Sequence, residues 1–336
     1  MPALTDLPRV LRPLLPGLLL SVTIAAAAGF LADHYGAPAM LFALLIGIAF
    51  NFLHEESTCR AGVDFAARTL LRLGVGLLGL RIALDDLAQF GWTGAAVIAG
   101  LVALTIATGF VVAPLLGRGW RFALLTGGAV AICGASAALG LAPGIPANEN
   151  TERNTLFTVM AVTTLSTIAM VAYPILFQTM DLSDIQRGFL IGVTIHDVAQ
   201  VVGAGFSISD SAGETATIAK LFRVALLPVV LVAVVLSLRI SGAGTAGGKV
   251  PLLPWFMVLF LVLSATGSAI DLPASVTGAV SDASRLLLVT AIAALGVKTS
   301  MRAMREVGPG HLGVVVIETL VLLGAALLLL GFVPLV

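Results

Sequence analysis

Three polar side chains lie close together in the middle of an apolar stretch, GFLIGVTIHDVAQVVGAG, at residues 188 to 205. His196 and Gln200 are four residues apart and share a helix face, and Asp197 and Gln200 are three residues apart and also neighbour each other. Ionisable groups in the middle of a membrane are costly unless they face a cavity or a partner, so they are functional candidates. Histidine also titrates near neutral pH, so His196 or Asp197 is a candidate carrier of a coupling proton. The alternative is that these side chains only cross-link helices.

A second segment, TGGAVAICGASAALGLAPG at residues 126 to 144, is rich in glycine and in small residues that weaken a helix. A break at Gly134, Ala135 and Ser136 would point backbone N–H groups and the positive end of a half-helix into the protein. Such a break predicts an anion site to which the Ser136 hydroxyl can also donate. For the glycines alone, tight packing of small residues between helices is an equal alternative.

Further charged residues inside apolar stretches are candidates for charge compensation or ion coupling. Lys220 and Arg223 are three residues apart and share a helix face, and Glu318 lies deep in the last apolar stretch. A buried glutamate needs a positive partner or a proton. Lys220, Arg223 and Arg285 all remain open as partners of Glu318.

Composition places the chain in the membrane. Hydrophobic residues make up 59% of it and charged residues 11%, against about one half and one quarter in soluble domains. The formal net charge is zero, so nothing indicates a nucleic-acid partner. Cys59 and Cys133 lack metal-ligand spacing and are predicted to be free thiols. Because GxxxxGK[ST], HExxH and GxSxG motifs are absent, we expect neither ATP use nor an enzyme, and no cofactor or metal.

Hydropathy predicts a polytopic all-α protein that forms a single transporter unit over residues 1–336. A bilayer core of about 30 Å requires about 20 apolar residues per helix. The first apolar run is followed by many others, so we expect an uncleaved helix there and not a signal peptide. The eleven predicted spans cover residues 13–33, 38–53, 67–85, 91–116, 121–142, 153–177, 185–207, 217–240, 251–270, 283–299 and 310–334.

The basic residues predict how the chain is oriented. If the spans alternate in direction, only five of the eighteen Lys and Arg residues lie on the side opposite the N-terminus: Arg81, Arg153, Lys220, Arg223 and Arg285. Cytoplasmic loops retain positive charge, so we expect the N-terminus in the cytoplasm and the C-terminus in the periplasm.

The chain also contains an internal repeat. Residues 67 to 92 align without a gap with residues 284 to 309, which sets Leu78-Gly79 on Leu295-Gly296 and Arg81 on Lys298. Arg81 and Lys298 are then either matched entrance charges of an anion path or side chains that snorkel to the membrane surface.

The repeat divides the chain into three blocks. Spans one to four, residues 13–116, pair with spans eight to eleven, residues 217–334, and leave residues 121–207 unmatched in the centre. A shift by an odd number of spans predicts inverted topology, which is typical of secondary transporters with a site at mid-membrane between discontinuous helices. The alternative is a chance likeness of two helix ends.

Six segments resemble the YeiH-type family of proposed sulfate exporters: PAMLFALLIGIAFN, LLRLGVGLLGLRI, AICGASA, IHDVAQVVGAG, ATIAKLFRVALLP and ALGVKTSM. The resemblance covers nearly the whole chain, and ICGASA and HDVAQVVGA are its most specific parts. It implies a bacterial inner-membrane protein related to the cation/proton antiporter and anion transporter superfamily. That group has inverted repeats and crossing broken helices in a core packed on a panel domain, and it often forms homodimers through the panel. Sulfate is implied by analogy alone.

Together these patterns predict a secondary active transporter of a small anion, namely sulfate, sulfite or a sulfonate, that works by alternating access in the lipid bilayer. The coupling ion would be H⁺ or Na⁺. The predicted substrate-binding residues are Gly134, Ala135, Ser136, His196, Asp197 and Gln200, and the predicted coupling or charge-compensating residues are Lys220, Arg223, Glu318, Arg81 and Lys298. Alternatives are an organic carboxylate transporter coupled to Na⁺ or H⁺ through Asp197 or Glu318, an anion channel, and a membrane enzyme or scaffold.

Overall fold

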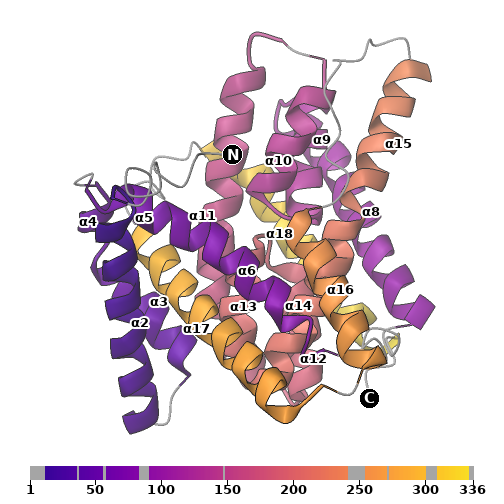
Figure 1. The fold of residues 1–336 in the computed structure, drawn as a ribbon. Coiled ribbons are helices and arrows are strands. Elements are labelled where there is room, and N and C mark those ends of the chain that lie inside the picture. Colours follow the sequence, from indigo (N-terminus) through magenta and orange to yellow (C-terminus); the bar gives the residue numbers. More distant parts are fainter. Residues whose placement is uncertain are drawn as a thin grey trace. The chain divides into compact units, whose positions relative to one another are not determined.

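A computed structural model describes residues 12–35, 38–55, 58–82, 91–146, 148–240, 254–270, 272–299 and 309–332. Within these ranges the chain is helical and has no β-strand (Figure 1), which confirms the all-α class. Helical segments occur in each of the eleven ranges predicted from hydropathy. The ends of the repeated blocks, residues 83–90 and 300–308, lie outside the described residues.

The membrane class is supported by helix length as well as by composition. Six helical segments are long and apolar enough to cross a bilayer: Leu15–Tyr35, Gly91–Leu115, Thr151–Gln178, Asp210–Val234, Ala274–Lys298 and Leu312–Phe332. Two shorter apolar helices are Ala39–Ala49 and Trp255–Ala269. The count of eleven spans and the inverted topology stay predictions.

The described helices form two compact units that alternate along the chain. The first unit contains α2 (Leu15–Tyr35), α3 (Ala39–Ala49), α4 (Phe52–Glu55), α5 (Arg60–Phe65), the π-helical turn η2 (Ala66–Leu70), α6 (Leu71–Leu78), α16 (Trp255–Ala269) and α17 (Ala274–Lys298). The second contains α8 (Gly91–Leu115), α9 (Trp120–Ala131), α10 (Ala135–Leu141), η3 (Ala142–Gly144), α11 (Thr151–Gln178), α12 (Asp184–Thr194), α14 (Asp210–Ala225), α15 (Leu227–Ile240), α18 (Pro309–Leu329) and η5 (Leu330–Phe332). Helix α13 (Val198–Phe206) begins in the second unit, and residues 202–210 are grouped with the first.

Glycines bring the helices of the first unit into backbone contact. Helix α17 packs on α3 and α6, and α16 packs on α6. A Cβ at Gly296 would meet the backbone of Leu44 on α3, and a Cβ at Gly79 would meet the backbone of Phe260 on α16. Gly79 and Gly296 are the aligned glycines of the predicted repeat, so both copies use this position to approach a neighbouring helix.

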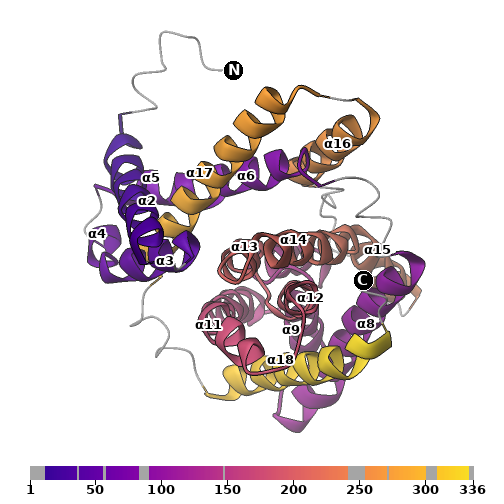
Figure 2. The same cartoon turned by 90° about the horizontal axis from the view of Figure 1, so that it is seen from below.

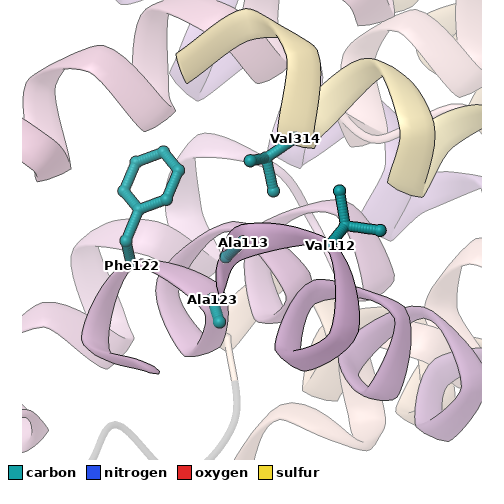
Figure 3. Close-up of a cluster of buried hydrophobic side chains, with 5 residues drawn as sticks. All are labelled: Val112, Ala113, Phe122, Ala123 and Val314. Carbon is teal, nitrogen blue, oxygen red and sulfur yellow. The ribbon is translucent and has the colours of Figure 1, made fainter. Parts of the chain in front are cut away.

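The second unit has a tightly packed interior. One apolar cluster of this unit, drawn in Figure 3, joins α8, α9 and α18 through Val112, Ala113, Phe122, Ala123 and Val314. Figure 2 shows α12 end-on, with α11, α14 and α18 around it. Every residue of α12 from Gly188 to Thr194 is buried, so this short helix belongs to the core.

The first of the two segments predicted to be broken crossing helices is a hairpin. Helix α10 runs back along α9, so that a Cβ at Gly128 would meet the side chain of Leu141. At the open end, Arg121 donates through Nε to the carbonyl oxygen of Pro146 at 3.0 Å. A helix that continued straight through its break would hold these pairs far apart. We call residues 120–146 the first hairpin.

The second predicted broken span also reverses direction. Gly188 and Gly192 on α12 lie against the backbone of Ala212 and Ala216 on α14, so these two helices run side by side in the same direction. Helix α14 begins shortly after α13 ends. Helix α13 must therefore return from the break to the level at which α12 began. We call residues 184–206 the second hairpin.

Helix α11 places the two hairpins at opposite ends of the unit. Its 28 residues extend about 42 Å at 1.5 Å per residue, which exceeds the bilayer core. The first hairpin ends where α11 begins, and the second begins where α11 ends. Each of these two segments therefore contains two half-length arms where hydropathy predicts one span. The two readings look alike in the sequence, because two half-length apolar arms have the same total length and hydropathy as one crossing helix.

Candidate functional site

The tips of the two hairpins meet inside the second unit. At the first tip, Gly134 adopts φ 62° and ψ −125°, a backbone region that is open almost only to glycine. A Cβ added to Gly134 would lie 3.4 Å from the Cβ of His196 at the second tip. The two segments in which the sequence predicts chemistry, CGAS and HDVAQ, are therefore neighbours in space.

Lys220 lies between the two tips. Its side chain is completely buried, and its ammonium donates to the carbonyl oxygens of Ile132 at 2.7 Å, of Ile195 at 2.9 Å, and of His196. These carbonyls lie at the C-terminal ends of α9 and α12, where the helices offer no further N–H partner. A helix C-terminus carries partial negative charge, so a cation is favourable at this point.

Arg223 binds the same two helix ends from one turn further along α14. Its guanidinium donates to the carbonyl oxygens of Val130 at 2.6 Å, Ala131 at 2.7 Å, Ile195 at 3.1 Å and Gly192 at 3.2 Å. The side chain is 1% exposed. The two cations of α14 therefore pair with backbone carbonyls of both hairpins.

Part of each tip is accessible. Ser136 is exposed and Ala135 and Asp197 are partly exposed, although the residues before Ala135 and Asp197 are buried. No side chain caps the start of α10, whereas the Asp197 carboxylate accepts the N–H of Ala199 at 2.9 Å at the start of α13. The tips therefore present the beginnings of two helices on their accessible side.

Helices α11 and α18 hold the polar side chains of the second hairpin. His196 Nε2 lies 2.9 Å from the Thr319 hydroxyl, which lies 2.7 Å from the carbonyl oxygen of Val315. If the single hydroxyl proton goes to Val315, then His196 is the donor to Thr319. Gln200 donates to the Thr167 hydroxyl at 2.7 Å. Among the described residues, His196 Nδ1 and Gln200 Oε1 are buried without a hydrogen-bond partner.

Glu318 has a hydroxyl partner. The Thr126 hydroxyl lies 2.8 Å from Glu318 Oε1, and Glu318 Oε2 is buried without a hydrogen-bond partner in the described part of the chain. Of the three cations considered from the sequence, two bind carbonyls and the third, Arg285, belongs to the first unit. The sequence signal for Thr126 is weak, because a threonine in a helix usually bonds to its own backbone, as Thr126 also does to Phe122.

Arg81 and Lys298, which the repeat aligns, each form an ion pair in the first unit. Arg81 lies 2.9 Å from the Asp210 carboxylate, and Lys298 lies 2.9 Å from that of Asp64. His54 Nε2 lies 3.7 Å from the same Asp64 oxygen. Each aligned basic residue therefore has an acidic partner, and the role of entrance charges stays a prediction.

We expect Asp64, in the short helix α5, to make the first unit sensitive to acid. Burial raises the pKa of Asp64. The hydrogen bond and charge of Lys298, together with the charge of His54, lower it by more, so the pKa of Asp64 is below its ordinary value. A depressed carboxyl pKa stabilises the fold above the unfolded-state pKa, and this stabilisation is lost as the pH falls through the folded-state pKa. Both side chains of the pair are about one-third exposed, so the loss should be about 0.2–1 kcal/mol.

Thermal unfolding of wild-type protein and Asp64→Asn at about pH 7 and about pH 3 checks this expectation. The wild type should lose more stability on acidification than the variant. Equal acid responses would show that the pair contributes nothing.

Two pockets of the described structure are each lined by more than one arginine. One of about 290 Å³ in the first unit is lined by Arg81, Arg285, Ser209 and Ser281 among others. The other, of about 180 Å³, lies at the open end of the first hairpin and is lined in part by Arg118, Arg121 and Arg153. Neither pocket includes a residue of the hairpin tips.

The described residues contain no group of three His, Cys, Asp or Glu side chains that could hold a metal ion. Cys59 and Cys133 are free thiols, which confirms the prediction.

Comparison with known proteins gives one consistent result. The family described as "Conserved hypothetical protein 698" matches residues 16–315. The UPF0324 membrane protein TauZ of Paracoccus denitrificans is 53% identical over 91% of this chain and 92% of its own length. UPF0324 membrane proteins of Rhizobium meliloti and Chlorobaculum tepidum are 51% and 49% identical, over 91% and 95% of this chain and 89% and 88% of their own lengths. No solved structure matches the chain significantly.

Proposed function

Because the chain belongs to the UPF0324 family of membrane proteins, we propose that it is a secondary active transporter of a small anion such as sulfate, sulfite or a sulfonate. One observation carries the proposal. Two half-length hairpins enter the same unit from opposite ends, and their tips meet at two buried cations, Lys220 and Arg223. Discontinuous helices that meet at mid-membrane are the typical substrate site of secondary transporters.

The charges near the tips favour an anionic substrate. Lys220 and Arg223 neutralise the negative C-terminal ends of α9 and α12, which leaves the positive beginnings of α10 and α13 on the accessible side. In this arrangement the Ser136 hydroxyl and the backbone N–H groups after Gly134 donate to the anion. His196 Nδ1, which lacks a partner, accepts when Nε2 donates to Thr319, so in the proposed mechanism it donates to the anion only after it takes up a proton. Gln200 Oε1 also lacks a partner, but as an acceptor it makes no hydrogen bond to an anion.

Alternating access follows from the opposed hairpins. Each hairpin can serve as the gate toward its own side of the membrane, and the tips between them form the common site. His196 or Asp197 carries the coupling proton in this mechanism, because both lie at the second tip, where substrate and gate meet.

With two hairpins, fewer segments cross the membrane, but the proposed orientation of the chain is the same. Among the described helices, nine segments then cross the bacterial inner membrane: α2, α3, α6, α8, α11, α14 with α15, α16, α17 and α18. In this arrangement Arg153 lies on the same side of the membrane as the N-terminus, and Arg187 lies on the opposite side. The excess of basic residues beside the N-terminus is unchanged, so the N-terminus stays cytoplasmic and the C-terminus periplasmic.

Ligand-dependent stability of the purified protein tests the proposal. Thermal unfolding is measured with sulfate, sulfite, several sulfonates and several carboxylates, with Ser136→Ala and His196→Ala as site variants. At least one sulfur oxyanion should raise the wild-type melting temperature by about 3 °C or more at saturating concentration. Both variants should respond less.

The possible outcomes separate the alternatives. If no anion stabilises the wild type, or if both variants respond as the wild type does, the proposed site is wrong. Stabilisation by carboxylates alone would support the organic carboxylate transporter. Flux far above carrier rates in proteoliposomes would support a channel.

A further inference from the structure

We propose that the hairpin tips form a binding site for a monovalent cation, which the Lys220 ammonium occupies permanently, so that the protein binds its anion without Na⁺. The cation site is inferred from contacts alone. Its consequence for coupling rests on the proposed transport function.

The geometry of the site matches an ammonium. Its three acceptors are the carbonyl oxygens of Ile132, from the first hairpin, and of Ile195 and His196, from the second. An ammonium has three protons, one for each carbonyl, whereas a neutral amine has two and would turn its lone pair toward the third oxygen. The contacts therefore fit the charged form of Lys220.

Carbonyl groups at such positions are also ligands for free cations. In secondary transporters, unwound backbone carbonyls and the C-terminal ends of half-helices coordinate the coupling Na⁺ or H⁺. Here the equivalent carbonyls come from α9 and α12 and converge on a cation that the chain itself supplies. A free Na⁺ would have to displace a buried ammonium tethered to α14.

Arg223 is not an alternative occupant of the same site. It binds the carbonyls of Val130, Ala131 and Gly192, which Lys220 does not bind, and shares only Ile195 with it. Removal of Lys220 would therefore leave the carbonyls of Ile132 and His196 without their cation, while Arg223 still holds the adjoining turns.

A simple structural role for Lys220 makes a different prediction. If Lys220 only stabilised two helix ends, its removal would destabilise the protein and small cations in solution would restore nothing specific. If the carbonyls form a cation site, a small cation that fits the vacated volume should rebind and restore stability. Chemical rescue therefore separates the two roles.

The experiment uses the purified full-length protein without anionic substrate. Melting temperatures of wild type, Lys220→Ala and Lys220→Met are measured in the chloride salts of methylammonium, ammonium, sodium and choline at equal ionic strength. Alanine leaves space for a cation, whereas methionine fills much of that space with an uncharged chain. Lys298→Ala, which removes a lysine from an ion pair in the first unit, is the matched control.

We expect Lys220→Ala to melt below the wild type and to recover by about 3 °C or more in methylammonium or ammonium relative to choline. The wild type, Lys220→Met and Lys298→Ala should melt at the same temperature in all four salts. Equal melting temperatures of Lys220→Ala in the four salts would overturn the cation site, as would rescue of Lys220→Met.

A second measurement keeps the proposal testable if Lys220→Ala does not fold. The wild type alone is tested for stabilisation by its best anion in sodium chloride and in choline chloride. Equal stabilisation supports a resident cation, and stabilisation that requires Na⁺ overturns it. If no anion stabilises the wild type in either salt, the transport proposal fails while the rescue experiment still decides the cation site.

Discussion

Arg223→Gln is expected to destabilise the second unit by about 3 kcal/mol or more. The guanidinium donates to four carbonyls at the ends of α9 and α12, and it is 1% exposed. Each buried acceptor left without its donor costs about 1–3 kcal/mol, and a glutamine amide cannot reach all four. Thermal unfolding of the purified protein measures the loss.

Arg187→Gln is the matched control for this prediction. Arg187 also donates to helix-terminal carbonyls, those of Phe177 and Met180, but it lies at the open end of the second hairpin and is 21% exposed. Water can replace these bonds, so the cost should stay below about 1 kcal/mol. Similar losses in the two variants would mean that Arg223 does not hold the tips together.

Gly134→Ala is expected to lower both stability and anion binding. The φ of 62° with ψ −125° lies outside the regions that an alanine adopts without strain, which costs about 1–3 kcal/mol. The added Cβ would lie 3.4 Å from the His196 Cβ, in van der Waals contact, so it is the backbone strain that should displace the tip at the proposed binding site. Melting temperature and anion-induced stabilisation are measured on the same sample.

Gly140→Ala in the same hairpin provides the comparison. A Cβ at Gly140 would meet nothing within 4 Å, and the residue lies inside α10. Alanine should therefore be neutral or stabilising by about 0.5–1 kcal/mol, because glycine weakens a helix interior. If the two glycine variants have the same melting temperature and the same anion-induced stabilisation, the conformation of Gly134 matters neither for stability nor for anion binding.

The helical segments could be predicted from the sequence, but their direction could not. The predicted span over residues 121–142 contains two arms, α9 and α10, that together have the length and hydropathy of one crossing helix. Hydropathy sums residues along the chain and does not register a reversal. The reversal is seen in the contact of Gly128 with Leu141 and in the hydrogen bond from Arg121 to Pro146. A hydropathy average contains no information on such contacts between residues that are distant in the sequence.

The candidate site could be predicted in part. The break at Gly134 and the polar group around His196 were evident, because small residues weaken helices and ionisable residues are rare in apolar spans. The family resemblance carried by these two segments is confirmed. The partners of the buried charges could not be predicted from the sequence, because Lys220 and Arg223 bind backbone carbonyls and Glu318 pairs with Thr126. Every residue has a carbonyl, so no side-chain pattern marks these acceptors.

The parallel packing of α12 on α14 has a consequence for the electric field at the tips. Gly188 and Gly192 bring the backbones of the two helices into contact, and α14 also carries Lys220 and Arg223. This packing fixes the two cations relative to the first arm of the second hairpin. In the proposed transport cycle, a movement of this arm would carry α14 with it, so the positive charge of Lys220 and Arg223 would accompany the second hairpin whichever side of the site opens.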